Sequence, residues 1–210
     1  MTELWLIRHG ETDWNLARRL QGWHDIELND LGRRQARLLA DRLGRDGHAF
    51  GAIYSSDLQR AHATALSVAE RLGMPVQAEP GMRERRCGVL EGLSMDDMDA
   101  REPEASAAWR GRDPDHPLGD GESLREFHQR VVQTMEVIAA RHAGERVLAF
   151  THGGVLDVAW RHAQDLPLTA PRHAKLVNCA INRVRVAAQR WRIIDWGDIS
   201  HIGAGEDDIV

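Results

Sequence analysis

Cysteine is scarce in this sequence, whose 210 residues contain only Cys87 and Cys179, and these form no C-x-x-C pair. So few cysteines favour a reducing compartment. Long hydrophobic runs are also missing, because the apolar run near the start, Leu4–Ile7, is four residues long and follows an acidic segment. The sequence therefore predicts neither a signal peptide nor a transmembrane helix. We expect a cytoplasmic protein without a membrane partner.

Blocks of basic residues are absent as well. The 27 Lys and Arg residues are mixed with 32 Asp and Glu residues, and the net charge is −5. This balance does not favour a nucleic acid or an anionic membrane as a partner. The eleven histidines show neither H-x-H nor H-x-x-x-H spacing, so no dedicated zinc site is expected.

Apolar residues, by contrast, are plentiful enough for a packed core, at 42% of the chain against 28% charged residues. At this length, one domain over residues 1–210 is expected. The predicted strands are 2–8, 49–55, 76–78 and 146–151, with a terminal antiparallel hairpin of 181–186 and 192–196. The predicted helices run from Asn29 to about Gly44, from Ser56 or Asp57 to Leu72, from Glu122 to about Arg141 and from His152 to about His162. Shorter helices are predicted near 94–100, 104–110 and 170–175.

This alternation of strands and helices predicts an α/β fold, with helices on both faces of a mostly parallel sheet and an antiparallel strand from the hairpin. Two segments interrupt the pattern. Residues 9–28 are predicted to form a long loop with at most one helical turn. Residues 80–121 have weak periodicity and form a long excursion, which is usually functional or flexible.

Unusual polar residues follow three of the predicted strands. Arg8-His9-Gly10 ends the first, Ser55–Arg60 follows the second, and Thr151–Gly154 follows the fourth. Because the carboxyl ends of parallel strands lie at one edge of a sheet, two histidines and two arginines are expected to converge there. Arginine binds phosphate oxygens with two parallel hydrogen bonds, so the sequence predicts a phosphate site at this edge.

The ordered set of motifs resembles the histidine phosphatase superfamily, whose fold is that of phosphoglycerate mutase. The matching segments are Arg8–Thr12 with Asn15, Leu28–Gly32 with Gln35 and Ala36, Ser55–Ala61 with Thr64 and Ala65, Glu84 with Gly88–Gly92, Gly121–Ser123, and Thr151–Gly154. The resemblance covers nearly the whole chain. It implies a three-layer α/β/α sandwich with a cap-like excursion at about 80–121.

The resemblance also implies catalytic roles. His9 would be the nucleophile that forms a phosphohistidine, which divides the transfer into two easier steps. A backbone carbonyl at the other ring nitrogen of His9 could fix its tautomer. Arg8, Arg60 and His152 would bind the oxygens of the transferring phosphoryl group. Glu84 would protonate the leaving oxygen and then activate water.

Further contacts follow from the same resemblance. Asn15 and the backbone N–H of Gly153 would bind phosphate, and Gln21 and Gly22 would contact the substrate. No metal or other cofactor is implied, because the arginines supply the positive charge. Three tryptophans are candidates for the wall of the pocket: Trp14 and Trp23 in the first loop and Trp109 in the excursion.

Members of the family are mutases or phosphatases. Similar mutases have a His-Tyr pair and a lysine after the acid, and this chain has neither in Glu84–Gly88 or Gly92–Met95. Trp109–Arg112 only partly matches the paired arginines that hold a mutase's second phosphate. The sequence therefore predicts a phosphatase of small phosphorylated metabolites, similar to the bacterial mutase-like broad-specificity phosphatases. A cofactor-dependent phosphoglycerate mutase and a catalytically idle phospho-ligand binding module are the alternatives, and a homodimer is plausible by resemblance.

Overall fold

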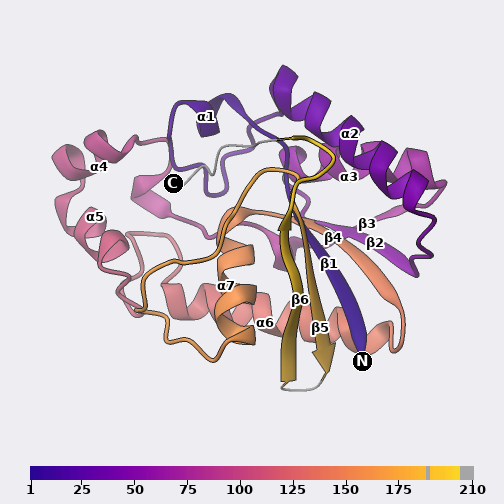
Figure 1. The fold of residues 1–210 in the computed structure, drawn as a ribbon. Coiled ribbons are helices and arrows are strands. Elements are labelled where there is room, and N and C mark those ends of the chain that lie inside the picture. Colours follow the sequence, from indigo (N-terminus) through magenta and orange to yellow (C-terminus); the bar gives the residue numbers. More distant parts are fainter. Residues whose placement is uncertain (188–189, 204–210) are drawn as a thin grey trace.

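A six-stranded sheet forms the centre of the computed structural model, which describes residues 1–187 and 190–203. Its strand order is β3-β2-β4-β1-β5-β6 (Figure 1). The strands are β1 (Thr2–Arg8), β2 (Ala52–Ser55), β3 (Val76–Ala78), β4 (Arg146–Thr151), β5 (Ile181–Ala187) and β6 (Arg190–Asp198). β1 to β4 pair in parallel, while β5 runs antiparallel to both β1 and β6. The predicted mixed sheet and terminal hairpin are confirmed.

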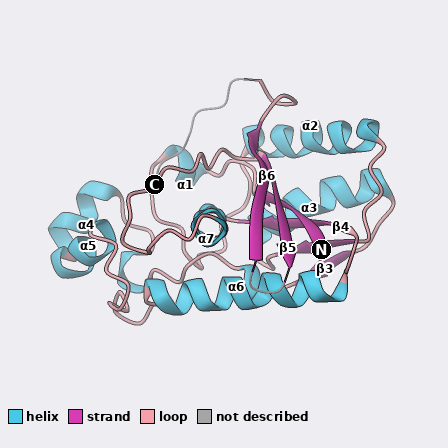
Figure 2. Cartoon of the chain, turned by 60° about the horizontal axis from the view of Figure 1, so that its bottom comes forward, coloured by secondary structure: helices cyan, strands magenta, loops and turns pink. Residues whose placement is uncertain are grey.

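Helices cover both faces of this sheet (Figure 2). The α-helices of the described residues are α1 (Asp13–Leu16), α2 (Asp30–Asp46), α3 (Gln59–Leu72), α4 (Met95–Arg101), α5 (Pro103–Arg110), α6 (Leu124–Arg141) and α7 (Gly153–Ala163). α2 and α3 pack on one face through Leu39, Leu43 and Val68, and α6 and α7 pack on the other through residues such as Phe127 and Leu156. The three-layer sandwich is confirmed. No helix among the described residues is long and apolar enough to cross a membrane.

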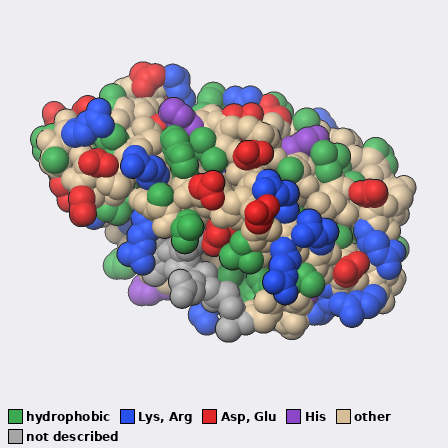
Figure 3. All heavy atoms as spheres, turned by 90° about the horizontal axis from the view of Figure 1, so that it is seen from above, with side chains coloured by type: hydrophobic (Ala, Val, Ile, Leu, Met, Phe, Trp, Pro, Cys, Tyr) green, Lys and Arg blue, Asp and Glu red, His purple; other side chains and the backbone are tan. Residues whose placement is uncertain are grey.

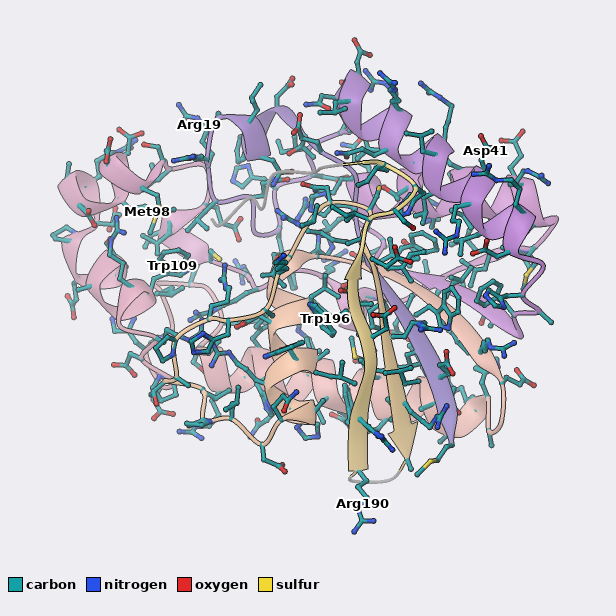
Figure 4. All side chains as sticks on the ribbon, viewed as in Figure 1. Arg19, Asp41, Met98, Trp109, Arg190 and Trp196 are labelled. Atoms are coloured by element: carbon teal, nitrogen blue, oxygen red, sulfur yellow. The ribbon has the colours of Figure 1, made fainter. Side chains whose placement is uncertain are left out.

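The excursion builds a cap beside the carboxyl edge of the sheet, where α4 and α5 lie away from the main layers (Figure 1). The cap has an apolar core of its own, made by Leu20, Cys87, Leu90, Leu93, Met98, Ala105 and Leu118. The backbone N–H of Leu20 donates to the Leu93 carbonyl at 3.0 Å, which ties the first loop to the cap. Arg19, Met98 and Trp109 are labelled on this side of the molecule in Figure 4.

The predicted helix over 170–175 is wrong. The chain from Ala163 to β5 is irregular, and three carbonyls on either side of 170–175 accept hydrogen bonds from arginine side chains. The acceptors are Pro167, Leu168 and Leu176, and the donors are Arg161, Arg112 and Arg8. Pro171 also disfavours a helical conformation at the residue before it. This connection runs along the wall of the cavity described below.

The predicted start of α3 is also wrong, because neither Ser56 nor Asp57 caps it. The Ser56 hydroxyl is hydrogen-bonded to His152, and Asp57 accepts two hydrogen bonds from Arg83 at 2.7 and 2.6 Å. Asp25, from the first loop, takes the capping role and accepts from the Gln59 N–H at 2.7 Å. Strand β2 is likewise shorter than predicted and begins at Ala52 rather than at 49.

Candidate active site

A cavity of about 520 Å³ opens between the carboxyl edge of the sheet and the cap. Eight of the nine predicted site residues line it: Arg8, His9, Asn15, Gln21, Gly22, Arg60, Glu84 and Gly153. Trp109 also lines the cavity, whereas Trp14 and Trp23 are not among its lining residues. Acidic and basic side chains are mixed on the outer face shown in Figure 3, so the arginine-rich lining sets this cavity apart from that face.

His9 follows β1 and is buried, with 2% of its surface exposed. Its Nδ1 lies 2.7 Å from the carbonyl oxygen of Gly10, so Nδ1 carries the proton and Nε2 keeps its lone pair. The predicted backbone carbonyl is therefore present. Burial, and then the charges of Arg60 and Arg8, hold the pKa of His9 well below its usual 6.5. The ring is a neutral base at physiological pH.

Arg8 reaches the cavity from the end of β1 and Arg60 from the first turn of α3, and backbone carbonyls fix both side chains. Arg8 donates to the carbonyl of Leu176, and Arg60 donates to those of Gly22 and His24 at 2.8 Å each. Burial lowers the pKa of Arg60 to about 10, so its guanidinium stays charged at neutral pH. Its Nε is buried without a hydrogen-bond partner among the described residues. An anionic ligand would satisfy that donor.

His152 lies behind this surface rather than in the cavity wall. Arg8 of β1 pairs with Thr151 of β4, so the residues that follow the two strands are neighbours, and the rings of His9 and His152 are 5.3 Å apart. Nε2 of His152 lies 2.8 Å from the Ser56 hydroxyl. Burial, followed by the charge of Arg60, holds the pKa of His152 well below its usual value. Its predicted contact with phosphate stays a prediction.

Glu84 enters the cavity from the start of the excursion. Its carboxylate accepts from the N–H of Gly154, at the start of α7, at 2.9 Å, and from that of Arg85 at 2.8 Å. Gly154 is required for this approach, because a Cβ there would lie 2.1 Å from Glu84 Oε1. Trp23 and Arg130 hold the segment by donating to the Glu84 carbonyl at 2.8 and 3.1 Å. Trp23 therefore supports the acid rather than lining the cavity.

The first loop brings the remaining predicted residues to the wall. Asn15 Oδ1 accepts from the Thr12 backbone N–H at 3.1 Å, which leaves the amide NH₂ as the group that can donate to a ligand. Gln21 is buried, and its Oε1 has no hydrogen-bond partner among the described residues. Gly22 has a φ of +48°, and a Cβ there would lie 2.1 Å from Glu91 Oε1.

Several residues that position the site were not predicted. Asn178 donates to the carbonyl of His9 at 2.7 Å, and Thr64 bridges the Gly10 N–H and the Arg60 carbonyl at 3.0 and 2.8 Å. Arg130 also pairs with Glu122 at 2.7 Å. Thr64 and Glu122 belong to the segments that resemble the superfamily, so the sequence could have indicated their roles. Asn178 comes from the connection before β5, where the sequence offers no periodic pattern.

Asp157 on α7 is the second carboxylate in the cavity wall, and it is 4% exposed. Its Oδ2 lies 2.9 Å from Arg112 Nη2 and 2.9 Å from Arg161 Nε, and its Oδ1 lies 3.8 Å from Arg172 Nε. Asp157 therefore holds together three guanidiniums, from the cap, from α7 and from the following connection.

We predict that Asp157→Ala lowers the free energy of unfolding by about 3–5 kcal/mol, because it leaves three arginines without their carboxylate. Chemical denaturation measures the change. Asp99→Ala is the matched control, since it removes the carboxylate of an exposed cap pair with Arg110. The control should have the same free energy of unfolding as the wild type. Equal unfolding free energies for Asp157→Ala and the wild type would contradict the burial of this cluster.

The low pKa values of His9 and His152 predict a dependence of stability on pH. Below pH 6.5 an unfolded histidine binds a proton, whereas these two stay neutral in the folded protein. The unfolded state then binds more protons, so the unfolding free energy decreases as the pH is lowered below 6.5, by up to about 1.4 kcal/mol per pH unit for each histidine. Urea titrations between pH 7.5 and 5.5 measure the slope. His152→Asn should reduce the slope and exposed His173→Asn should leave it unchanged; an unaltered slope in His152→Asn would refute the prediction.

A neutral buried histidine, two fixed arginines and a carboxylate at a helix N-terminus form one site. The histidine is a nucleophile, the arginines neutralise a phosphoryl group, and the carboxylate can exchange a proton with the leaving oxygen. Among the described residues, no three His, Cys, Asp or Glu side chains come together as a metal-binding group. Fold and site together define an enzyme of phosphoryl transfer.

Comparison with known proteins agrees with this conclusion that the chain is an enzyme of phosphoryl transfer. The model of the histidine phosphatase superfamily (branch 1) matches residues 4–199. A metal-independent phosphoserine phosphatase of Arabidopsis thaliana is 41% identical over 207 residues, covering 97% of this chain and 84% of the relative. A probable phosphoglycerate mutase GpmB of Serratia proteamaculans is 33% identical, covering 96% and 95%. The solved mycobacterial glucosyl-3-phosphoglycerate phosphatase with VO3 is 32% identical, with a TM-score of 0.78 and coverage of 93% and 98%.

The chain therefore belongs to the histidine phosphatase superfamily, as its motifs predict. The phosphoglycerate-mutase-like fold is confirmed by the same comparisons. Within the superfamily, the chain is a phosphatase of small molecules.

Proposed function

We propose that the chain hydrolyses small phosphorylated metabolites through a phosphohistidine on His9. The observation that carries this proposal is the 2.7 Å contact between His9 Nδ1 and the Gly10 carbonyl, beside two charged arginines. It leaves Nε2 with a lone pair in a site that favours the neutral ring. A histidine held in this way has the tautomer and the charge of a nucleophile.

In the first step, Nε2 of His9 attacks phosphorus, the P–N bond forms and the ester P–O bond breaks. Arg8 and Arg60 hold the equatorial oxygens, with His152 completing the cradle. Asn15, through its amide, and Gly153, through its backbone N–H at the start of α7, add donors to the phosphate. Glu84 gives its proton to the leaving oxygen, which departs as an alcohol.

In the second step, Glu84 takes a proton from water as the water oxygen attacks phosphorus. The P–N bond breaks, the electron pair returns to Nε2, and inorganic phosphate leaves. Gln21 and Gly22 line the wall of the cavity. In this mechanism they contact the part of the substrate that departs first. The arginines supply the positive charge that stabilises the transferring group in both steps.

The names of the relatives support hydrolysis, since two of those compared are phosphatases of phosphoserine and of glucosyl-3-phosphoglycerate. One of the relatives is a probable phosphoglycerate mutase. Transfer of a phosphoryl group from one position of a substrate to another is therefore the alternative to hydrolysis. An assay with p-nitrophenyl phosphate and a panel of phosphometabolites, run beside a coupled mutase assay with 2,3-bisphosphoglycerate, separates the two. We expect phosphate release and negligible mutase turnover. Dominant mutase turnover would contradict the proposal, and binding without turnover would indicate an idle phospho-ligand module.

We further propose that the protein works in the cytoplasm and forms a homodimer. Cys87 and Cys179 are buried free thiols, which a reducing compartment preserves. Light scattering coupled to gel filtration measures the oligomeric state.

A further inference from the structure

Ser56 is a fully buried serine to which the mechanism above gives no role. Ser55 of β2 pairs with Phe150 of β4, so Ser56 and His152 come directly after neighbouring parallel strands. The Ser56 hydroxyl oxygen lies 2.8 Å from Nε2 of His152, which is equally buried. Two polar side chains shielded from water in this way have to satisfy their hydrogen bonds within the protein.

The direction of this hydrogen bond decides which ring nitrogen of His152 carries the proton. The Ser56 oxygen already accepts the N–H of Leu58 at 3.3 Å, and its other partner among the described residues is Nε2. If Nε2 carried the proton, it would donate to the same oxygen, and the hydroxyl proton would be left without an acceptor. If the hydroxyl donates to Nε2, its donor and acceptor roles are both used, and the ring proton lies on Nδ1.

The neutral ring of His152 then presents Nδ1 as a hydrogen-bond donor. Burial, followed by the charge of Arg60, holds the pKa of His152 well below its usual value, so the ring carries one proton rather than two. Nδ1 is buried and has no hydrogen-bond partner among the described residues. A buried N–H group is stabilised by an acceptor, and the oxygens of a phosphoryl group are strong acceptors.

The chain at His152 places Nδ1 near the phosphate. Nδ1 is bonded to Cγ and therefore lies at the backbone end of the ring, whereas Nε2 lies at the far end, toward Ser56. The backbone continues into Gly153, which begins α7 and lines the cavity. A Cβ at Gly153 would lie 3.5 Å from Arg8 Nε, so this backbone packs against the guanidinium that holds the phosphate in the proposed mechanism.

We propose that Ser56 is a positioning residue whose hydroxyl donates to Nε2 of His152 and thereby directs the Nδ1–H of that ring to an oxygen of the transferring phosphoryl group. The inference rests on the proposed function for the place of the phosphate. The Gly10 carbonyl and the Ser56 hydroxyl then select the same tautomer in two neighbouring histidines, for opposite uses. His9 offers the lone pair of Nε2 to phosphorus, and His152 offers the proton of Nδ1 to oxygen.

Nuclear magnetic resonance of the unmodified protein with ¹⁵N-labelled histidine tests the tautomer directly. The signals of His152 are those that disappear in His152→Asn. At neutral pH its Nδ1 should have the shift of a protonated nitrogen, and its Nε2 that of an unprotonated one. Inorganic phosphate should shift Nδ1 and its proton more than Nε2. A proton on Nε2, or an Nδ1 signal that does not respond to phosphate, overturns the proposal.

Ser56→Ala removes the donor, so both tautomers of His152 should become populated. The dissociation constant of inorganic phosphate should rise about tenfold, and kcat/KM for p-nitrophenyl phosphate should fall by a similar factor. Ser56→Thr keeps the hydroxyl and should restore the tautomer, which a merely structural role of Ser56 does not predict. Ser55→Ala is the matched control, because it removes a neighbouring buried hydroxyl that donates to the Ser56 carbonyl. It should keep the wild-type tautomer.

A Ser56→Ala protein with the wild-type tautomer and wild-type affinity for phosphate overturns the proposal. If Ser56→Ala does not fold, the spectra of the unmodified protein decide, since they need no change at Ser56. Hydrolysis through a phosphohistidine is measured separately. The expected tautomer and its response to phosphate without hydrolysis reject the proposed function alone, whereas hydrolysis with the proton of His152 on Nε2 rejects the role of Ser56 alone.

Discussion

His9→Ala should lower kcat for every phosphomonoester by about 10⁴-fold or more, because it removes the atom that accepts the phosphoryl group. The effect on substrate binding should be much smaller, since Arg8 and Arg60 keep their backbone anchors and the cavity keeps its charge. Steady-state kinetics with p-nitrophenyl phosphate measure the loss, and calorimetry with inorganic phosphate measures the binding that remains.

His48→Ala provides the control for this prediction. His48 packs against Trp5 and Phe50, among residues that do not line the cavity, so its loss should leave kcat unchanged. A His9→Ala enzyme that hydrolysed its substrates at a tenth of the wild-type rate or faster would rule out covalent catalysis at this ring. Hydrolysis would then have to proceed by direct attack of water on the phosphorus of the substrate.

Glu84→Gln should reduce kcat by about 10²–10³-fold for substrates with an alkyl leaving group. The amide keeps the shape of the side chain and one acceptor for the Gly154 N–H, but it cannot exchange a proton. With p-nitrophenyl phosphate the first step needs little protonation, because the leaving phenolate is already stable. The second step still needs a base to activate water, so the phosphorylated enzyme should accumulate.

This difference between leaving groups separates a catalytic role of Glu84 from a structural one. A variant that had merely lost its fold would lose activity equally on both kinds of substrate and would show no burst. Rapid-quench kinetics with p-nitrophenyl phosphate should give a burst of nitrophenol close to one equivalent. Glu70→Gln, an exposed change on α3, is the matched control and should behave as the wild type. Equal loss on both substrates without a burst would contradict the role.

The half of the site that holds the phosphate could be predicted because its residues follow strands. Arg8 ends β1, His9 follows it, and Gly153 begins the helix after β4, so sheet order and the parallel direction place them at one edge. Glu84 does not directly follow a strand, and its role as the acid was predicted from the resemblance of its motif to the superfamily. Local sequence contains this information, since a buried strand and the residue after it are adjacent in the chain.

The remainder depends on contacts between distant segments. Asp157 meets Arg112 from 45 positions earlier, and Asp25 caps a helix 34 positions away. Neither pairing leaves a periodic trace in the sequence. Residues 170–175, which include Arg172, were predicted to be a helix, yet they are irregular, and the Pro167 and Leu168 carbonyls just before them accept from Arg161 and Arg112. Where a side chain binds a residue far away in the sequence instead of a near one, the spacing of residues does not predict the contact.

The central claim is that His9 forms a covalent bond to phosphorus during hydrolysis. Glu84→Gln, mixed with p-nitrophenyl phosphate and quenched in base, should yield a peptide spanning His9 that is heavier by one phosphoryl group, and acid should release that group as phosphate. His9→Ala/Glu84→Gln should yield no modified peptide. Mass spectrometry that found the phosphoryl group on another residue, or found none while turnover continued, would contradict the account.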